Sequence, residues 1–224
     1  MRPRNKKHLE ERFEKCSSIV VADPAIMKGN WRSAFLSVEE EKKPLHLEIG
    51  CGKGAFVTGM AQKNPEVSFV AMECVKNVIV TAMEKVVAAD YKNIIFINNN
   101  ADFLCEYFAE GEVDRIYLNF SDPWPRNKHA KYRLTYKTYL EKYAKILAPG
   151  GCIVQKTDNR GLFDFSVESF TENGWRLENV SYNLHSDETP AEILSANVIT
   201  EYENRFMELG QPIHRLEAFP PVKL

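Results

Sequence analysis

Beyond residue 44, the chain alternates between short apolar runs of strand length and longer segments with helical periodicity. The apolar runs lie at 45–49, 67–72, 94–97, 113–120 and 152–156. The helical segments lie at 53–63, 75–89, 102–108, 136–147 and 161–172. Strands that alternate with helices in this way build right-handed crossovers and a parallel sheet that is covered on both faces. The pattern therefore predicts an α/β fold with a Rossmann-like sheet.

The C-terminal part of the chain departs from this alternation. Two further strands are predicted at 175–184 and 197–207, and the segment between them, which contains Pro190, is predicted to be a loop. Because no helix separates these strands, we expect an antiparallel hairpin at one edge of a mostly parallel, seven-stranded sheet. Residues 1–44 are predicted to form a helix and an arm before residues 45–224, the main part of a single domain.

Composition sets bounds on the class of protein. The chain has 224 residues, of which 44% are hydrophobic and 27% are charged, enough for one sizeable core in a globular domain. No apolar run approaches the length that spans a bilayer, and the basic N-terminus lacks the apolar core of a signal peptide. The five cysteines are widely spaced and form no CxxC pair. We therefore expect a cytoplasmic protein with reduced thiols and no bound metal.

The net charge of −2 conceals two basic segments. Residues 1–16 carry six Lys or Arg and three Glu, a balance of +3, and residues 126–137 carry five Lys or Arg and no acid, a balance of +5. The rest of the chain therefore sums to −10. General attraction to polyanions is not expected from such a chain, but a local phosphate-binding face is. Solvated surface charge explains residues 1–16 equally well, but it fits 126–137 less well because that segment follows a constrained loop.

The constrained loop is Ser121-Asp122-Pro123-Trp124-Pro125, which directly follows the apolar run 113–120. Proline fixes its own φ, and Pro123 also pushes Asp122 into an extended conformation. The loop is therefore predicted to hold a carboxylate and an indole at fixed angles beside a cationic strip. This pairing favours chemistry on an anionic substrate, of which nucleic acid is the obvious example. For Trp124, stacking on a base and bracing of the loop agree equally well with the sequence.

A glycine-rich turn follows the first predicted strand, in the sequence Glu48-Ile49-Gly50-Cys51-Gly52-Lys53-Gly54. Glycines at this point allow a tight turn and the close approach of a ligand at the carboxyl end of the strands. Glu73 closes the second strand, where a carboxylate accepts both hydroxyls of a ribose. The spacing loosely matches a dinucleotide fingerprint, but Glu48 would repel a pyrophosphate and suits a cofactor that carries an ammonium and a sulfonium. A turn whose acid caps a helix is the simpler alternative, and Asn100 fits either turn chemistry or an adenine contact.

Together, these motifs resemble those of one family, the bacterial tRNA (guanine-N7-)-methyltransferases. The resemblance covers nearly the whole chain, and its most specific part is the Ser-Asp-Pro-Trp-Pro block. Supporting segments are Lys28-Gly29-Asn30-Trp31, 47–54, Arg133-Leu134-Thr135, Lys156-Thr157-Asp158-Asn159 and Thr200-Glu201-Tyr202-Glu203, together with His129 and Lys131. The resemblance implies a class I S-adenosylmethionine-dependent methyltransferase that converts the variable-loop guanosine at position 46 of tRNA to 7-methylguanosine.

The same resemblance implies roles for individual residues. The cofactor S-adenosylmethionine would be bound by Glu48, Gly50, Gly52, Gly54, Glu73, Asn100 and Asp122. The substrate would contact Arg126, Asp158, Thr200, Glu201, Tyr202 and Glu203. RNA would meet Lys128, His129, Ala130, Lys131, Tyr132 and Arg133, with Arg2, Arg4, Lys6 and Lys7 as further phosphate contacts. Because guanine N7 carries a free lone pair, catalysis needs positioning and charge stabilisation rather than a base, and Asp122 is the expected catalytic residue.

Three positions depart from the family pattern: Arg126 stands where Lys is usual, Tyr132 where Arg is usual, and Asn100 where Asp is frequent. The expected partner is tRNA, and the sequence indicates neither a protein partner nor a membrane. It is compatible with a monomer or a homodimer. An exocyclic-amine methyltransferase, a nicotinamide-dependent oxidoreductase and a non-catalytic RNA-binding module remain alternatives. The first matches the loop only in part, the second lacks evident hydride-transfer residues, and the third leaves Glu48 and Glu73 without a purpose.

Overall fold

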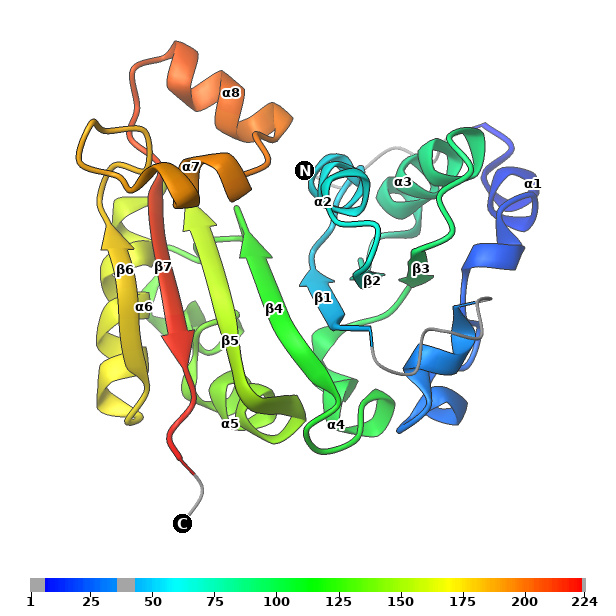
Figure 1. The fold of residues 1–224 in the computed structure, drawn as a ribbon, viewed down its shortest axis with the longest axis horizontal. Coiled ribbons are helices and arrows are strands. Elements are labelled where there is room, and N and C mark those ends of the chain that lie inside the picture. The colour runs from blue at the N-terminus through cyan, green and yellow to red at the C-terminus, as the bar shows by residue number, and fades with distance from the viewer. Residues whose placement is uncertain (1–6, 36–42, 223–224) are drawn as a thin grey trace.

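The computed structural model describes residues 7–35 and 43–222, and within these ranges a sheet of seven strands forms the centre of the molecule (Figure 1). The strands are β1 (Leu45–Ile49), β2 (Ser68–Met72), β3 (Ile94–Ile97), β4 (Val113–Asn119), β5 (Leu147–Thr157), β6 (Arg176–Ser181) and β7 (His214–Phe219). Their order is β3-β2-β1-β4-β5-β7-β6. The first five in this order pair in parallel, whereas β7 runs antiparallel to both β5 and β6. This topology confirms the predicted mostly parallel sheet with an antiparallel edge.

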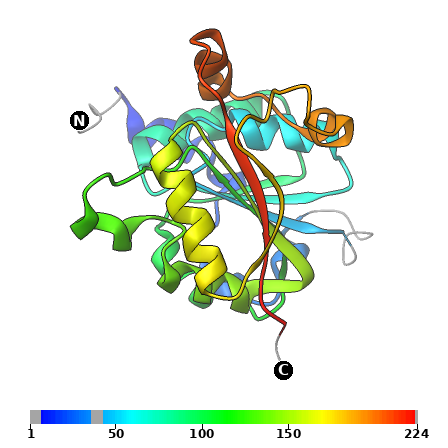
Figure 2. The ribbon, with the colours of Figure 1, turned by 90° about the vertical axis from the view of Figure 1, so that its left-hand side faces the viewer.

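Helices cover both faces of the sheet (Figures 1 and 2). One face carries α2 (Ala55–Lys63) and α3 (Lys76–Ala88), and the other carries α4 (Leu104–Tyr107), α5 (Lys137–Ile146) and α6 (Arg160–Glu172). Alternate side chains of a strand enter two separate apolar clusters. In β2, Val70 and Met72 belong to one cluster, and Phe69 and Ala71 belong to the other. A strand that is buried on both faces reads as a continuous apolar run, which is why the sequence predicted these strands well.

Residues 7–35 pack against the rest of the described molecule. The helix α1 (Leu9–Glu14) contacts α3, where the Arg12 guanidinium and the Glu84 carboxylate lie 2.6 Å apart. Trp31 is fully buried in the core, and its indole Nε1 donates to the carbonyl oxygen of Tyr107 at 2.8 Å. The segment 7–35 therefore shares its hydrophobic core with the sheet. The division of the chain at residue 44 stays a prediction.

The strand predicted at 197–207 is wrong. That segment contains the helix α8 (Glu201–Glu208), and the predicted loop before it contains α7 (Ala191–Ala196). The hydroxyl of Thr200 caps α8 by accepting the N–H of Glu203 at 3.1 Å, and both side chains are buried. Residues three apart share one face of a helix, whereas in a strand they would lie on opposite faces, so the burial of both side chains fits the helix. Two helices, rather than a plain loop, therefore connect the edge strand β6 to its antiparallel neighbour β7.

The strand β7 was not predicted, because charged residues on one of its faces interrupt the apolar pattern of the sequence. His214, Leu216 and Ala218 are buried, whereas Arg215 and Glu217 point to the other side of the sheet and form an ion pair. The two helices that precede β7 lie at the end of the sheet where the parallel strands terminate (Figure 1). Among the described residues, no helix combines the length and the apolarity needed to cross a bilayer.

Candidate active site at the carboxyl ends of the strands

The glycine turn after β1 lies where the strand order reverses, between β1 and β4. Open α/β sheets bind ligands in the crevice at such a point. Gly50 and Gly52 have φ angles of 80° and 56°, and a Cβ at either position would meet no atom within 4 Å. At Gly54 a Cβ would lie 2.7 Å from the Cβ of Ala82 in α3. The first two glycines therefore border open space, whereas Gly54 acts indirectly, by allowing the turn to pack closely on α3.

Glu48, the penultimate residue of β1, is buried next to this turn. Its Oε1 accepts a hydrogen bond from the Asn119 amide at 3.1 Å, whereas no described residue donates to its Oε2. Burial raises the pKa of the Glu48 carboxyl to about 7, although the Asn119 hydrogen bond and the charge of Lys156 oppose this rise. A buried oxygen without a donor is costly, so the site fits a ligand that supplies one.

The next two strand ends contribute Glu73 and Asn100. The carboxylate of Glu73 accepts the N–H of Gly52 at 3.2 Å and the N–H of Val75 at 2.9 Å, which ties it to the glycine turn. The Oδ1 of Asn100 accepts the N–H of Asp102 at 2.9 Å and so caps a short 3₁₀ turn. The structure therefore gives Asn100 the turn role that its residue type favours, and the same side chain also lines a cavity with Glu73.

Two adjoining cavities meet at these residues. The β3-side cavity, of about 450 Å³, has walls that include Glu73, Asn100, Asp102, Asp122, Trp124 and Tyr132. The α8-side cavity, of about 400 Å³, has walls that include Glu48, Gly52, Lys53, Thr200, Glu201 and Tyr202. Residues common to both cavities are Gly50, Glu73, Asn119, Phe120 and Asp122. Three predicted carboxylates, from the ends of β1, β2 and β4, thus converge on one crevice.

The loop after β4 has an unusual backbone. Phe120 and Trp124 have φ angles of 50° and 42°, in a region that residues with side chains rarely adopt. The guanidinium of Arg133 donates to the carbonyl oxygens of Pro123 at 3.0 Å and Trp124 at 3.1 Å. Asp122 lies between Phe120 and Trp124 in the chain and is exposed, and no described residue donates a hydrogen bond to its carboxylate. Arg133, for which we expected RNA contact, therefore stabilises the loop that carries Asp122.

The basic segment continues from this loop as a 3₁₀ turn, η6 (Asn127–Tyr132), which projects from the body of the molecule (Figure 2). Its exposed cationic side chains are Arg126, Lys128 and Lys131. Ala130 and His129 are half-buried behind them. Arg126 lies outside both cavities. Of the other predicted phosphate contacts, Lys7 is exposed, and Arg2, Arg4 and Lys6 lie outside the described residues.

The helix α8 brings its first turn to the α8-side cavity. The residues of this turn that line the cavity are Thr200, Glu201 and Tyr202. The ring of Tyr202 stacks on that of Phe120, with centroids 6.2 Å apart. Glu203 is instead fully buried, and its carboxylate bonds to Lys156 at 2.6 Å and His185 at 2.9 Å. Of the four predicted substrate residues in this segment, three therefore face the cavity and one does not.

Asp158 follows β5 and is half-buried. The cap of the next helix is its neighbour Asn159, whose Oδ1 accepts the N–H of Leu162 at 2.8 Å. Asp158 lines neither the β3-side nor the α8-side cavity. Its contact with substrate stays a prediction.

Sequence reasoning missed Asn119 and Phe120, which line both cavities, and Lys156, which lines neither cavity but whose charge acts on Glu48. Asn119 is a polar residue at the end of an apolar strand, and this interruption is a usable signal. Lys156 is likewise a charge within the apolar strand β5 and is only 2% exposed, and lysine is rarely buried unless it is paired. Phe120 carried no signal, because an apolar residue at the end of an apolar run looks like part of the core.

The chain is similar to known methyltransferases in sequence and in fold. A family model described as "Putative methyltransferase" matches residues 42–216. A tRNA (guanine-N(7)-)-methyltransferase of Lactococcus lactis subsp. cremoris (strain SK11) is 47% identical over 224 residues, covering 100% of both chains. The protein of the same name from Bacillus subtilis (strain 168) is 44% identical over 218 residues, covering 97% of this chain and 98% of the relative. The solved structure of the 16S rRNA methyltransferase KamB is similar with a TM-score of 0.57 at 15% identity, covering 80% of this chain and 89% of that chain, a likeness of fold alone.

Proposed function

The chain belongs to the tRNA (guanine-N(7)-)-methyltransferase family, and we propose that it transfers the methyl group of S-adenosylmethionine to N7 of the guanosine at position 46, in the variable loop of tRNA. The observation that carries this proposal is the convergence of Glu48, Glu73 and Asp122 on one crevice around the glycine turn. This convergence occurs in a chain that aligns over its whole length with relatives of that name. The product is 7-methylguanosine.

S-adenosylmethionine, when bound, supplies an electrophilic methyl group on a positively charged sulfur. Glu48 is suited to the cofactor's ammonium, because its Oε2 is buried and no described residue donates to it. Glu73 is suited to the ribose hydroxyls, since it directly follows β2 and lies on the wall that both cavities share. Asn100, which follows β3 and lines the β3-side cavity, is assigned to the edge of the adenine in this proposal. The open space beside Gly50 and Gly52 leaves room for the cofactor against the backbone.

The transfer needs no base, because guanine N7 carries a lone pair. The N7–carbon bond forms as the carbon–sulfur bond breaks with its electron pair left on sulfur, so the positive charge passes to the purine. Asp122 lies on the wall shared by both cavities. A fixed carboxylate beside a purine that becomes cationic lowers the barrier. The hydrogen bonds that the Arg133 guanidinium donates to the carbonyl oxygens of this loop position the carboxylate before substrate binds.

The exposed cations behind this loop hold the phosphates of tRNA in this proposal. Arg126, Lys128 and Lys131 supply charge, and His129 and Ala130 complete the surface of the turn. The start of α8 forms a wall of the α8-side cavity, with the buried Thr200 and the exposed Glu201 and Tyr202. Asp158, which follows β5, is kept as a further substrate contact.

Glu203 has a different role in this proposal, as a positioning residue. Its two carboxylate oxygens bond to Lys156, His185 and Asn197. Because both oxygens are occupied and buried, we assign Glu203 to holding α8 rather than to contact with the substrate.

The protein acts on tRNA in the cytoplasm, as a monomer or a homodimer.

The test is to incubate the protein with methyl-labelled S-adenosylmethionine and unmodified tRNA, digest the RNA and identify the labelled nucleoside. We expect label in 7-methylguanosine. The matched control is tRNA with 7-deazaguanosine at position 46, which lacks the acceptor nitrogen and should take no label. Label on an exocyclic amine would instead support the other methyltransferase chemistry. A protein that binds a nicotinamide cofactor but not S-adenosylmethionine would overturn the cofactor assignment.

A further inference from the structure

Three aromatic rings gather at the surface beside Asp122. The ring centroid of Trp124 lies 5.3 Å from that of Tyr132 and 5.9 Å from that of His129. The centroids of His129 and Tyr132 are 5.9 Å apart, so each ring contacts the other two. Trp124 is 37% exposed and Tyr132 is 48% exposed, in contrast to Trp31, which is fully buried in the core.

This cluster borders the β3-side cavity. Trp124 and Tyr132 both line the cavity, together with Asp122 and Glu73. The left-handed backbone of Trp124, whose carbonyl oxygen is bonded to Arg133, fixes the position of the indole. Rings that only braced the loop would gain most from complete burial. These two instead keep a large part of their surface open beside the carboxylate to which we assign catalysis.

The charge around the rings fits RNA. The ammonium of Lys131 lies 5.2 Å from the ring centroid of Tyr132, and the exposed side chains of Arg126 and Lys128 are close in the chain. Proteins stack unpaired bases on aromatic faces while neighbouring cations hold the phosphates. The adenine of the cofactor is assigned to the other wall of the cavity, at the end of β3. The rings of Trp124 and Tyr132 are therefore left for a second purine.

We propose that Trp124 and Tyr132 form a stacking platform for the target guanine, and that the indole face of Trp124 stabilises the positive charge that the purine acquires during methyl transfer. This inference rests on the proposed function. An aromatic face attracts a cation, and Trp does so best. The contact is therefore stronger in the transition state and the product than with neutral guanine. An interaction of that kind raises kcat rather than only lowering KM.

The first test compares alanine and aromatic replacements in steady-state kinetics with tRNA. We expect Trp124→Ala to lower kcat/KM by about 5- to 150-fold, the range for loss of a base–aromatic stack, with most of the loss in kcat. Tyr132→Ala should act mainly through KM, because Tyr132 supplies contact area. Trp124→Phe and Tyr132→Phe should keep most of the activity, since each retains an aromatic face. Wild-type kinetics in Trp124→Ala would overturn the proposal.

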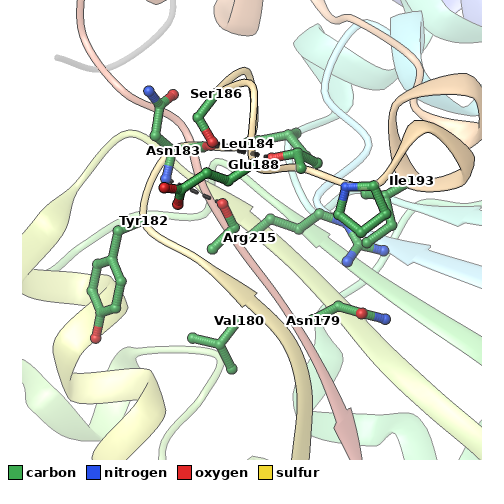
Figure 3. Close-up of a pocket in the computed structure, with 12 residues that line it drawn as sticks. Asn179, Val180, Tyr182, Asn183, Leu184, Ser186, Glu188, Ile193 and Arg215 are labelled. Atoms are coloured by element: carbon green, nitrogen blue, oxygen red, sulfur yellow. Dashed lines mark hydrogen bonds between the residues drawn. The ribbon is translucent and has the colours of Figure 1, made fainter.

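Tyr182 provides a matched control. It is 43% exposed, and the guanidinium of Arg160 lies 4.3 Å from its ring centroid, so it is also an exposed tyrosine beside a cation. It lines a pocket at the end of β6 (Figure 3), and this pocket shares no lining residue with the β3-side cavity. Tyr182→Ala should leave kcat/KM for tRNA unchanged. Equal losses in Tyr182→Ala and Tyr132→Ala would show a general effect of removing surface rings, and would contradict the platform.

An abasic nucleotide at position 46 distinguishes the target base from a flanking base. The affinity of tRNA is measured for the wild type and Trp124→Ala, with and without the base. If Trp124 stacks on the target guanine, the loss caused by Trp124→Ala disappears when that base is already absent. A loss that persists assigns the ring to another base and refutes this pairing. Affinity for S-adenosylmethionine should be the same in all variants, because a parallel loss would assign the rings to the cofactor's adenine.

A binding experiment without methyl transfer separates this inference from the proposed function. Guanosine 5′-monophosphate and its 7-methyl derivative are titrated by calorimetry at pH 6. We expect the cationic 7-methyl compound to bind the wild type more tightly, and Trp124→Ala, but not Tyr182→Ala, to lose that preference. Absence of the preference in the wild type overturns the platform even if tRNA is methylated. A preference without any methylation of tRNA supports the platform while the proposed function fails.

Discussion

The ammonium of Lys156 and the carboxylate of Glu203 lie 2.6 Å apart, and both side chains are almost completely removed from solvent. Lys156 belongs to β5 and Glu203 to α8, 47 residues later in the chain. The other oxygen of Glu203 accepts a hydrogen bond from the Asn197 amide at 2.7 Å, and the His185 Nε2 lies 2.9 Å from the same oxygen. The pair therefore fastens α8, whose first turn lines the α8-side cavity, to the end of the strand next to β4.

Neutralising the acid of this pair should strongly destabilise the protein. Burial lowers the pKa of Lys156, and the Glu203 charge opposes that shift, so Glu203→Gln leaves a buried cation without its counter-charge. We expect the free energy of unfolding to fall by about 3–5 kcal/mol, measured by urea titration. The control is Glu201→Gln, since Glu201 is 67% exposed and 4.0 Å from Lys53, and it should change stability by less than about 1 kcal/mol. Similar losses in the two variants would contradict the buried clamp.

The site residues that could be predicted are those whose role is indicated by residues close to them in the sequence. Glu48 and Glu73 each end an apolar strand, and the ends of parallel strands meet at one edge of the sheet. The glycine turn and the proline-flanked Asp122 also carry their conformational information within a few residues. Their convergence on one crevice therefore followed from the order of elements alone.

The roles of Glu203 and Arg133 could not be predicted, because each depends on a distant or folded partner. In the sequence, Glu203 is one of several acids near the C-terminus, and nothing local indicates that Lys156 will bury it. Arg133 looks like one more member of a basic segment, yet its guanidinium donates to two carbonyl oxygens of the preceding loop. Such roles appear only when the tertiary structure brings the partners together, and they override local periodicity.

Removing the Asp122 carboxylate should affect the rate more than binding. In Asp122→Ala, no fixed negative charge faces the purine as it becomes cationic, and we expect kcat to fall by about 10²–10³-fold. Asp122→Asn keeps a hydrogen-bonding group without the charge, so its rate should be close to that of the alanine variant. Single-turnover assays at saturating tRNA and cofactor measure the step directly. A rate for Asp122→Asn that equals the wild type would show that charge stabilisation is not the role of this residue.

Lys128 should contribute to affinity through phosphate alone. Its side chain is exposed on the projecting turn η6. We expect Lys128→Ala to weaken tRNA binding and to reduce the slope of log K against log salt by about 1, the loss of one phosphate contact. Filter binding over a series of salt concentrations provides the slope. A slope identical to that of the wild type would exclude Lys128 from the phosphate-binding face.

Arg133 should behave in the opposite way. Arg133→Lys keeps the positive charge but cannot reproduce the paired hydrogen bonds to Pro123 and Trp124. We expect an unchanged salt slope and a decrease in kcat of about 10- to 100-fold, because the loop that positions Asp122 loses its support. The Lys128→Ala variant is the matched comparison. If Arg133→Lys instead reduced the salt slope with normal kcat, Arg133 would be a phosphate contact rather than a positioning residue.

The raised pKa of Glu48 has a consequence for stability. Burial raises the pKa of this carboxyl to about 7 in the folded, cofactor-free protein, from an ordinary value of 4.5. The stabilising contribution of the protonated form is therefore complete below pH 4.5 and is lost as the pH rises through about 7. We expect the wild type to lose more stability than Glu48→Gln between pH 5 and pH 7.5, by about 2 kcal/mol. Thermal or urea unfolding of both proteins at several pH values measures the difference, and parallel curves would argue against a raised pKa.

The same carboxyl should make cofactor binding pH-dependent. An ammonium binds to the ionised form of Glu48, whereas the free protein holds a proton there up to about pH 7. Affinity for S-adenosylmethionine should therefore rise about fivefold between pH 6 and pH 7.5, before the cofactor's own amino group loses its proton near pH 8. Calorimetry at pH 6 in two buffers with different ionisation enthalpies should show release of nearly one proton for each cofactor bound. Glu48→Gln should bind more weakly, with no proton release and little dependence on pH in this range. Proton release that persists in Glu48→Gln would assign the titration to another group and remove Glu48 as the partner of the ammonium.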